Sequence, residues 1–388
     1  MTRRRDFLKL CTMMGVGTVL NLYTGEISQV LAQAAQKKHV IWLQGGSDSG
    51  CTVSILQAAH PDLIDAIVDF KLAADHWATV MTPEDDPRYD LGWWSAGYRS
   101  EDTSNVPLIN AVFGNAPVDA LIVEGTVQTG TPKGGAPGQY CVLTEHEGQP
   151  VTMWEAAQKL YRKAAYTVAY GQCSSFGNIP SAKGNLTGSV SLVNSLKTAN
   201  VYDPKKPVIS IAGCPGHPDW MLLTLASVLQ GFNPDIDEMG RPRAFFNQFI
   251  HDGCPRRGYY DKGEFAVNYD DPQCLWKLGC RGPITVSHCA ITRWNNGVGF
   301  CTQQGPMCWG CMHPNFPDSP AGGDPTQPAP GSFFNEVEAA PSLLGVNVNT
   351  AALALAGGAA IGIAAHALRR KGGRSPPEEH EAVEVEHE

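Results

Sequence analysis

One histidine and seven cysteines gather in residues 251–311, and their types and spacing are those of metal ligands. They occur as His251-x-x-Cys254, Cys274-x5-Cys280, Cys289, Cys301 and Cys308-x-x-Cys311. Soft thiolates at short spacing, with an imidazole among them, are what iron–sulfur clusters and zinc sites need. Eight candidate ligands make two four-ligand sites.

A further set of polar residues lies far apart in the first part of the chain, each directly after a predicted strand. They are Asp48, Cys51, Glu124, Cys173 and Cys214. Because open α/β sheets bind ligands at the carboxyl ends of their strands, we expect these residues to converge. Three thiolates and Asp48 would make a third four-ligand site. Any one of these cysteines alone would more often be a small buried hydrophobic residue.

The elements that must position these residues alternate between strand and helix patterns. Predicted strands are 39–43, 77–81, 118–123, 166–170 and 208–212, and predicted helices are 55–70 with a break at Pro61, 106–113, 152–163 and 189–196. This alternation predicts a mostly parallel sheet with helices on both faces. We therefore expect a flavodoxin-like, doubly wound α/β domain over residues 35–217. An irregular, loop-rich iron–sulfur domain should follow over residues 218–317.

Both ends of the chain carry targeting patterns. Residues 1–34 contain Arg4-Arg5-Asp6-Phe7-Leu8-Lys9 before an apolar run, which predicts a twin-arginine signal peptide. Residues 350–368 are apolar enough to predict a transmembrane anchor after a linker over 318–349. Arg369-Arg370-Lys371 opens a charged tail over 369–388, which by the positive-inside rule stays in the cytoplasm with the body on the outer face of the membrane. The alternatives are a frayed amphipathic N-terminal helix and a surface helix of a soluble protein.

Bulk composition limits the possible functions. The 388 residues are 43% hydrophobic and 17% charged with a net charge of −9, and no basic stripe points to nucleic acid. Twelve cysteines in an exported protein would ordinarily suggest disulfides. The twin-arginine route exports folded proteins, so cofactors can be inserted first in the reducing cytoplasm. Cys141, in a loop rich in glycine and proline, is interpreted as structural.

In order along the chain, several motifs resemble one family closely, the small, electron-transferring subunit of membrane-bound nickel–iron hydrogenases. After the twin-arginine leader the motifs are Trp42-Leu-Gln-Gly, Val123-Glu-Gly, Gly171-Gln-Cys-Ser-Ser-Phe-Gly, Ala212-Gly-Cys-Pro, Cys254-Pro-Arg-Arg, Cys274-Leu-Trp-Lys-Leu-Gly-Cys-Arg-Gly-Pro, Arg293-Trp-Asn and Cys308-Trp-Gly-Cys, followed by the C-terminal anchor. The match covers roughly residues 1–370. So many ordered motifs make the resemblance specific.

The resemblance implies three iron–sulfur clusters in a line. The proximal 4Fe–4S cluster would be held by Asp48, Cys51, Cys173 and Cys214, with Glu124 beside it. The medial cluster, 4Fe–4S or 3Fe–4S, would be held by Cys289, Cys301, Cys308 and Cys311. The distal 4Fe–4S cluster would be held by His251, Cys254, Cys274 and Cys280. No catalytic residue is expected in this chain, because the nickel–iron centre of such enzymes lies in a separate large subunit.

Two positions depart from the usual family pattern. Asp48 stands where most members have the first proximal cysteine, a change that resembles an actinobacterial-type, oxygen-insensitive branch. Cys301 stands where most members have proline, so it could complete four thiolates around the medial cluster or be a bystander. The extra cysteines of the oxygen-tolerant type would fall near Gly50 and Asn178 and are absent.

The leading hypothesis is therefore an electron-transfer subunit that passes electrons from H2 oxidation to a membrane cytochrome b or quinone. The expected assembly is an oligomer of heterodimers with a large subunit. A second hypothesis is an exported iron–sulfur subunit of a different membrane oxidoreductase. A third is a secreted, non-redox binding protein with disulfides or structural zinc, which iron content would separate from the other two.

Overall fold

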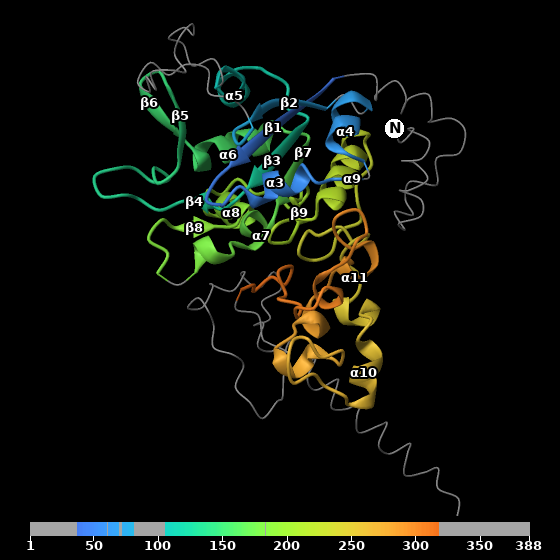
Figure 1. Cartoon of the computed structure of the whole chain (residues 1–388). Coiled ribbons are helices and arrows are strands. Elements are labelled where there is room, and N and C mark those ends of the chain that lie inside the picture. Colours follow the sequence, from blue (N-terminus) through green and yellow to red (C-terminus); the bar gives the residue numbers. More distant parts are fainter. Residues whose placement is uncertain (1–36, 60, 70–71, 81–104, 183, 318–388) are drawn as a thin grey trace, which may run out of the picture. The chain divides into compact units, whose positions relative to one another are not determined.

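The fold begins with a parallel sheet whose strands are separated by helices. A computed structural model of the chain describes residues 37–59, 61–69, 72–80, 105–182 and 184–317. Its five parallel strands lie in the order β2-β1-β3-β7-β9 (Figure 1). Their bounds are β1 Lys38–Gln44, β2 Leu72–Trp77, β3 Ala120–Glu124, β7 Tyr166–Tyr170 and β9 Ile209–Ile211. Counted along the chain this order is 2-1-3-4-5, so the strand order reverses between β1 and β3, where open α/β sheets form a crevice.

Both faces of the sheet are buried, which explains why the central strand β3 is buried at every residue rather than at every second one. In β1, Val40 and Trp42 belong to one hydrophobic core, whereas Ile41 and Leu43 belong to the other. The first core also contains side chains of the helices α3 Gly50–Ile55, α4 Leu63–Asp69 and α9 Pro218–Leu229. The second contains side chains of α5 Val106–Val112, α6 Met153–Lys163 and α8 Leu192–Thr198. The expectation of helices on both faces of a parallel sheet is confirmed.

Smaller elements complete this region. The short helix α7 Gln172–Phe176 follows β7 directly. Two antiparallel pairs lie outside the main sheet, β4 Val127–Gln128 with β8 Ser189–Val190 and β5 Val142–His146 with β6 Gln149–Thr152. Neither pair was predicted, because both lie outside the alternation of strands and helices from which the main sheet was predicted.

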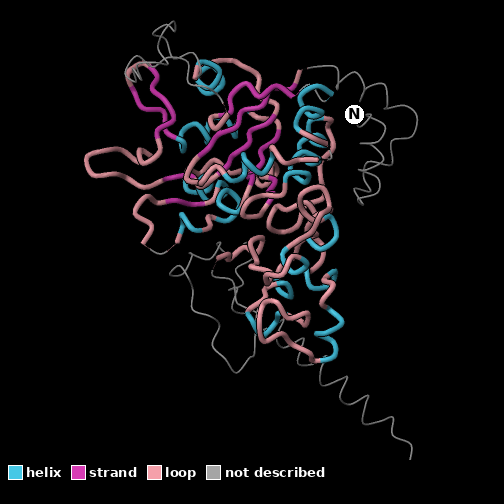
Figure 2. The backbone as a smooth tube through the Cα atoms, in the orientation of Figure 1, coloured by secondary structure: helices cyan, strands magenta, loops and turns pink. Residues whose placement is uncertain are grey.

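The described residues after α9 are almost entirely loops and short helices, as predicted (Figure 2). The two α-helices in that described part are α10 Arg257–Lys262 and α11 Cys289–Thr292. Single turns of 3-10 helix cover Ile250–Gly253, Leu275–Leu278, Gly282–Ile284 and Cys301–Gln303. Every one of these short segments except α10 and the turn at Gly282–Ile284 contains one of the predicted metal ligands or directly follows one.

Three predicted elements have different bounds in the structure. The strand predicted at 77–81 lies earlier in the chain, as β2, which ends at Trp77. The ring of Trp77 stacks on that of Trp42, with ring centroids 4.3 Å apart. As an edge strand, β2 tolerates Asp75, which accepts a 2.5 Å hydrogen bond from His39. The helix predicted at 55–70 is two helices, α3 and α4, separated around Pro61. The helix predicted at 189–196 begins after Ser191, which caps α8.

No helix among the described residues is long and apolar enough to cross a membrane. The predicted signal peptide, linker, anchor and tail all lie outside the described residues.

Candidate functional site

The sheet brings Asp48, Cys51, Cys173 and Cys214 to one edge, and we call these residues the strand-end group. Asp48 and Cys51 follow β1, with Cys51 in the first turn of α3. Cys173 lies in α7 directly after β7, and Cys214 lies three residues beyond the end of β9. Parallel strands end at the same edge of a sheet, so residues separated by more than 160 positions in sequence become neighbours.

Contacts within the strand-end group are close. The Asn178 amide donates to Cys173 Sγ at 3.3 Å and to Cys214 Sγ at 3.5 Å. A Cβ at Gly171 would lie 2.2 Å from Cys51 Sγ, so only glycine fits between β7 and that thiol. Burial, with smaller contributions from the charges of Cys214, Asp48 and Glu124, raises the pKa of Cys173 to about 12.

Glu124 ends β3 beside this group and is fully buried. Its carboxylate accepts hydrogen bonds from Trp42 Nε1 at 3.1 Å, from the Thr52 backbone N–H at 3.0 Å and from Thr52 Oγ1 at 2.5 Å. Three donors satisfy a buried carboxylate that would otherwise be costly. The negative charge of Glu124 raises the pKa of Cys51, after burial and alongside Cys173 and Cys214.

His251, Cys254, Cys274 and Cys280 form a second set, the histidine group. The charge of Cys254 raises the pKa of both Cys274 and Cys280, in each case after burial. Burial and the neighbouring Arg257 lower the pKa of His251, so its imidazole is neutral at pH 7. Its Nε2 atom is buried and has no hydrogen-bond partner among the described residues. A neutral imidazole with a free buried nitrogen is suited to bind a metal.

Cys289, Cys301, Cys308 and Cys311 form the third set, the middle group. Burial, with a smaller contribution from the charge of Cys301, raises the pKa of Cys289 to about 11. Burial also raises the pKa of Cys311, followed by the charges of Cys289, Cys301 and Cys214. Cys301, the position that departs from the family pattern, therefore lies within electrostatic reach of two predicted partners.

The middle group contacts both of the others. The backbone of Cys214, in the strand-end group, lies close enough to Cys311 to lower the pKa of its thiol against the larger effect of burial. Next to Cys280 of the histidine group, the backbone N–H of Arg281 donates to the carbonyl of Cys308 in the middle group at 2.8 Å. The side chain of Gln172, next to Cys173, also donates to the carbonyl of His313 at 2.7 Å. The three groups are therefore joined in the order strand-end, middle, histidine.

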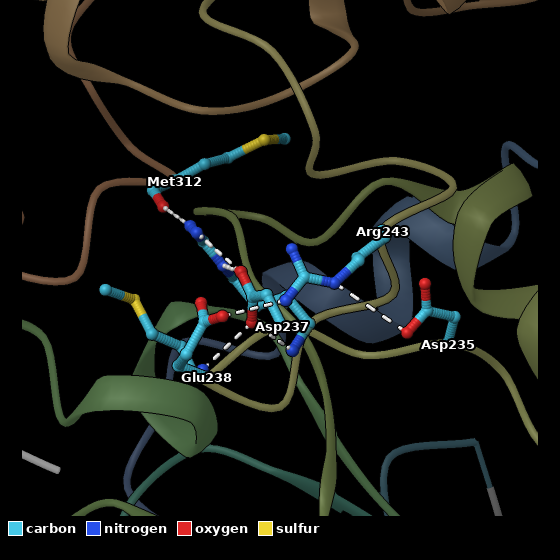
Figure 3. Close-up of polar contacts among 7 residues, drawn as sticks. Asp235, Asp237, Glu238, Arg243 and Met312 are labelled. Carbon is cyan, nitrogen blue, oxygen red and sulfur yellow. Dashed lines mark hydrogen bonds and ion pairs between the residues drawn. The ribbon is translucent and has the colours of Figure 1, made fainter. Parts of the chain in front are cut away.

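A buried ion pair holds the chain next to Cys311. The side chains of Arg241 and Asp237 are each only 6% exposed, and Arg241 donates to Asp237 Oδ2 through Nε and Nη2, both at 2.8 Å. Arg241 Nη1 also donates to the carbonyl of Met312 at 3.4 Å, and Asp237 and Met312 are labelled in Figure 3. The loop over residues 235–243 is thereby tied to the residue that follows Cys311.

The donor set fits iron–sulfur clusters better than single ions. All eleven cysteines of the described chain are free thiols. Among the same residues, no three His, Cys, Asp or Glu side chains gather closely enough to hold one metal ion. A cluster is several atoms wide and takes ligands that stand farther apart than those around one zinc ion. The raised thiol pKa values mean that metal binding must displace protons.

Sequence reasoning did not find the side chains that contact the sulfur atoms. Besides Asn178, they include Ser287, whose hydroxyl lies 3.2 Å from Cys289 Sγ, and Thr302, whose hydroxyl lies 3.2 Å from Cys254 Sγ. Serine, threonine and asparagine are common in loops, so nothing in their local sequence distinguishes these three. The one weak signal in the sequence was that Ser287 lies two residues before the predicted ligand Cys289.

Two family models and several known proteins match the chain. Residues 246–321 match the family model for the C-terminal part of the NiFe/NiFeSe hydrogenase small subunit, and residues 49–228 match NADH ubiquinone oxidoreductase, 20 Kd subunit. The periplasmic [NiFeSe] hydrogenase small subunit of Desulfomicrobium baculatum is 36% identical over 332 residues, which is 81% of this chain and 96% of that protein. The chain belongs to the small subunits of nickel–iron hydrogenases.

Solved hydrogenase structures have the same fold. The crystal structure of the reduced, active Ni-Fe-Se hydrogenase from Desulfomicrobium baculatum matches with a TM-score of 0.63 and 35% identity, over 74% of this small subunit and 99% of that chain. The actinobacterial-type NiFe-hydrogenase from Ralstonia eutropha H16 matches with a TM-score of 0.62 and 27% identity, over 90% of this small subunit and 94% of that chain. Membership of this family confirms that the motifs are those of a nickel–iron hydrogenase small subunit and implies a partner large subunit.

Proposed function

We propose that this small subunit holds three iron–sulfur clusters and relays electrons between a nickel–iron centre in the large subunit and an external acceptor. The observation that carries the proposal is the order of contacts: Gln172, next to Cys173, donates to the carbonyl of His313 beyond Cys311 at 2.7 Å, and Arg281, next to Cys280, donates to the carbonyl of Cys308 at 2.8 Å. Bound iron–sulfur clusters supply reversible one-electron transfer. The chain's own part is to hold the ligands close together and out of water.

The three groups correspond to the proximal, medial and distal clusters. The strand-end group would bind the proximal 4Fe–4S cluster, the middle group the medial one and the histidine group the distal 4Fe–4S cluster. A neutral His251 in place of a thiolate leaves the distal cluster less negative, which favours its reduced state. Exposed Cys214 and Asp48 place the strand-end group at the surface of this chain. A large subunit would cover it there.

Asp48 is proposed as the fourth proximal ligand. Its charge raises the pKa of Cys173 and Cys214, so the carboxylate lies within electrostatic reach of both thiols. Its Oδ1 accepts the Gly50 N–H at 2.8 Å, a turn that fixes the side chain beside the start of α3. The similarity to the actinobacterial-type enzyme supports placing this small subunit in that branch.

Cys301 is proposed as the fourth medial ligand. Its charge acts on Cys289 and Cys311, and the sulfur of a free cysteine at this position is chemically able to bind a fourth iron atom. The medial cluster would then be 4Fe–4S rather than 3Fe–4S.

The destination of the electrons is also a proposal. Residues 350–368 would anchor the subunit in the cytoplasmic membrane after twin-arginine export, with the body outside and a cytochrome b or quinone as acceptor. Relatives described as periplasmic support export. The complex is expected to form an oligomer of heterodimers.

A second candidate function is that of an iron–sulfur subunit of a different membrane oxidoreductase. It is favoured only by the match of residues 49–228 to the 20 Kd subunit of NADH ubiquinone oxidoreductase.

Elemental analysis of the complex, purified from membranes without oxygen, distinguishes the two candidate functions. About twelve iron atoms per chain, matching acid-labile sulfide and co-purifying nickel are expected for three 4Fe–4S clusters and a hydrogenase partner. The same iron without nickel would favour the second candidate. Zinc, or no metal, would refute both.

A further inference from the structure

Asn178 occupies a position that unites two ligands of the strand-end group. Its side-chain nitrogen lies 3.3 Å from Cys173 Sγ and 3.5 Å from Cys214 Sγ, although these cysteines follow different strands. The residue is only 1% exposed. One amide group thus bridges the sulfur atoms that follow β7 and β9 inside the protein.

The chemistry of the two thiols decides which end of the amide faces them. As cluster ligands Cys173 and Cys214 would be thiolates, which accept hydrogen bonds and cannot donate, so the amide would present its N–H atoms and not its oxygen. Oδ1 of Asn178 points away and has no partner among the described residues.

The backbone at Asn178 provides a second, independent observation. Its φ of 51° and ψ of −152° fall in a region that residues other than glycine rarely adopt. Asn178 follows Gly177 at the end of α7 and precedes the 3-10 turn Ile179–Ser181. Such strain persists only where the surrounding structure enforces it, and glycine at this position would relieve it. The asparagine side chain at this strained position therefore makes an interaction that glycine could not make.

We propose that Asn178 is the hydrogen-bond donor that sets the reduction potential of the proximal cluster. The inference rests on the proposed function, because it assumes that Cys173 and Cys214 bind that cluster. Hydrogen bonds to ligand sulfur stabilise the state with more negative charge, which is the reduced state. Asn178 is a positioning residue in this sense, since it acts through the two cysteines.

The test is a redox titration, monitored by electron paramagnetic resonance, of the complex with its large subunit. Asn178→Gly removes both donors and relieves the backbone strain, so the variant should fold. Asn178→Asp keeps the shape but places a carboxylate against the two thiolates. In Asn178→Gly we expect the reduced-to-oxidised ratio of the proximal cluster at a fixed potential to fall about tenfold, which is a shift of about 59 mV to lower potential for one electron. Asn178→Asp should shift it further in the same direction.

Two controls isolate the effect. Asn200→Gly changes the same residue type at a similar positive φ of 55°, but at an exposed site after α8, and should leave all three potentials unchanged. Ser287→Ala removes a hydroxyl that lies 3.2 Å from Cys289 Sγ and should leave the proximal potential unchanged. A proximal potential in Asn178→Gly equal to that of the parent would overturn the role of Asn178. A parent complex without three cluster signals would instead refute the proposed function.

Discussion

Replacing Asp237 with asparagine should loosen the loop that is tied to the middle group. Asp237 Oδ1 accepts the backbone N–H groups of Met239 at 2.9 Å and Arg241 at 2.8 Å, and an asparagine oxygen can keep both. Oδ2 accepts hydrogen bonds from two guanidinium nitrogens of Arg241. In asparagine an amide nitrogen would take the place of Oδ2, and its N–H groups cannot accept these hydrogen bonds. The substitution therefore leaves a buried guanidinium without its counter-charge.

The expected cost follows from burial. Both side chains of the pair are 6% exposed, and breaking a buried ion pair on one side typically costs about 3–5 kcal/mol. The Arg243–Glu238 pair in the same loop has the same 2.8 Å separation, but its side chains are 44% and 65% exposed (Figure 3). An exposed pair of this kind contributes about 0–1 kcal/mol. Glu238→Gln is therefore a control matched in loop, distance and chemistry.

Hydrogen exchange of the purified complex measures the difference locally. At about 1.4 kcal/mol for each factor of ten, Asp237→Asn should speed exchange of the amides in residues 237–243 by roughly 100- to 5,000-fold, limited by global unfolding. Glu238→Gln should change it less than about fivefold. Adding Arg241→Met to Asp237→Asn should restore much of the protection, since no unpaired charge then remains. Equal effects of Asp237→Asn and Glu238→Gln would refute the argument from burial.

Three further predictions concern the candidate ligands and a buried histidine. Asp48→Cys should retain the proximal cluster and lower its potential, because a soft thiolate donates more strongly to iron than a carboxylate; an unchanged redox titration would show that Asp48 is not a ligand. Cys301→Pro should reduce the iron at the medial site from about four atoms to about three and produce a 3Fe–4S signal in the oxidised protein, whereas an unaltered spectrum would exclude Cys301 as a ligand. Burial lowers the pKa of His217, so the unfolded chain binds a proton that the folded chain does not once the pH falls below the ordinary value of about 6.5. Stability should therefore decline with acidification below that pH, and His217→Gln should remove part of this slope in thermal unfolding of the complex; an identical slope would show that His217 does not contribute.

The sequence by itself determined the types of ligand and the kind of sheet. Strands flanked by helices produce a parallel sheet wherever both faces are covered, and residues after such strands must meet at one edge. Asp48, Cys51, Cys173 and Cys214 were therefore expected together from their places in the sequence alone. The short spacing of the later cysteines predicts metal ligands, which remains a prediction. The inference about the sheet and its edge succeeds because it depends on the periodicity of the sequence.

Only the tertiary structure decided which atoms surround the sulfur ligands. No local pattern predicts that Asn178 bridges Cys173 and Cys214, or that Gln172 donates to the carbonyl of His313. The strand ending at Trp77 was displaced for the same reason, since stacking on Trp42 and pairing with β1 outweigh local propensity. Such contacts join residues tens of positions apart, and their energies depend on the packed state and not on neighbours in sequence.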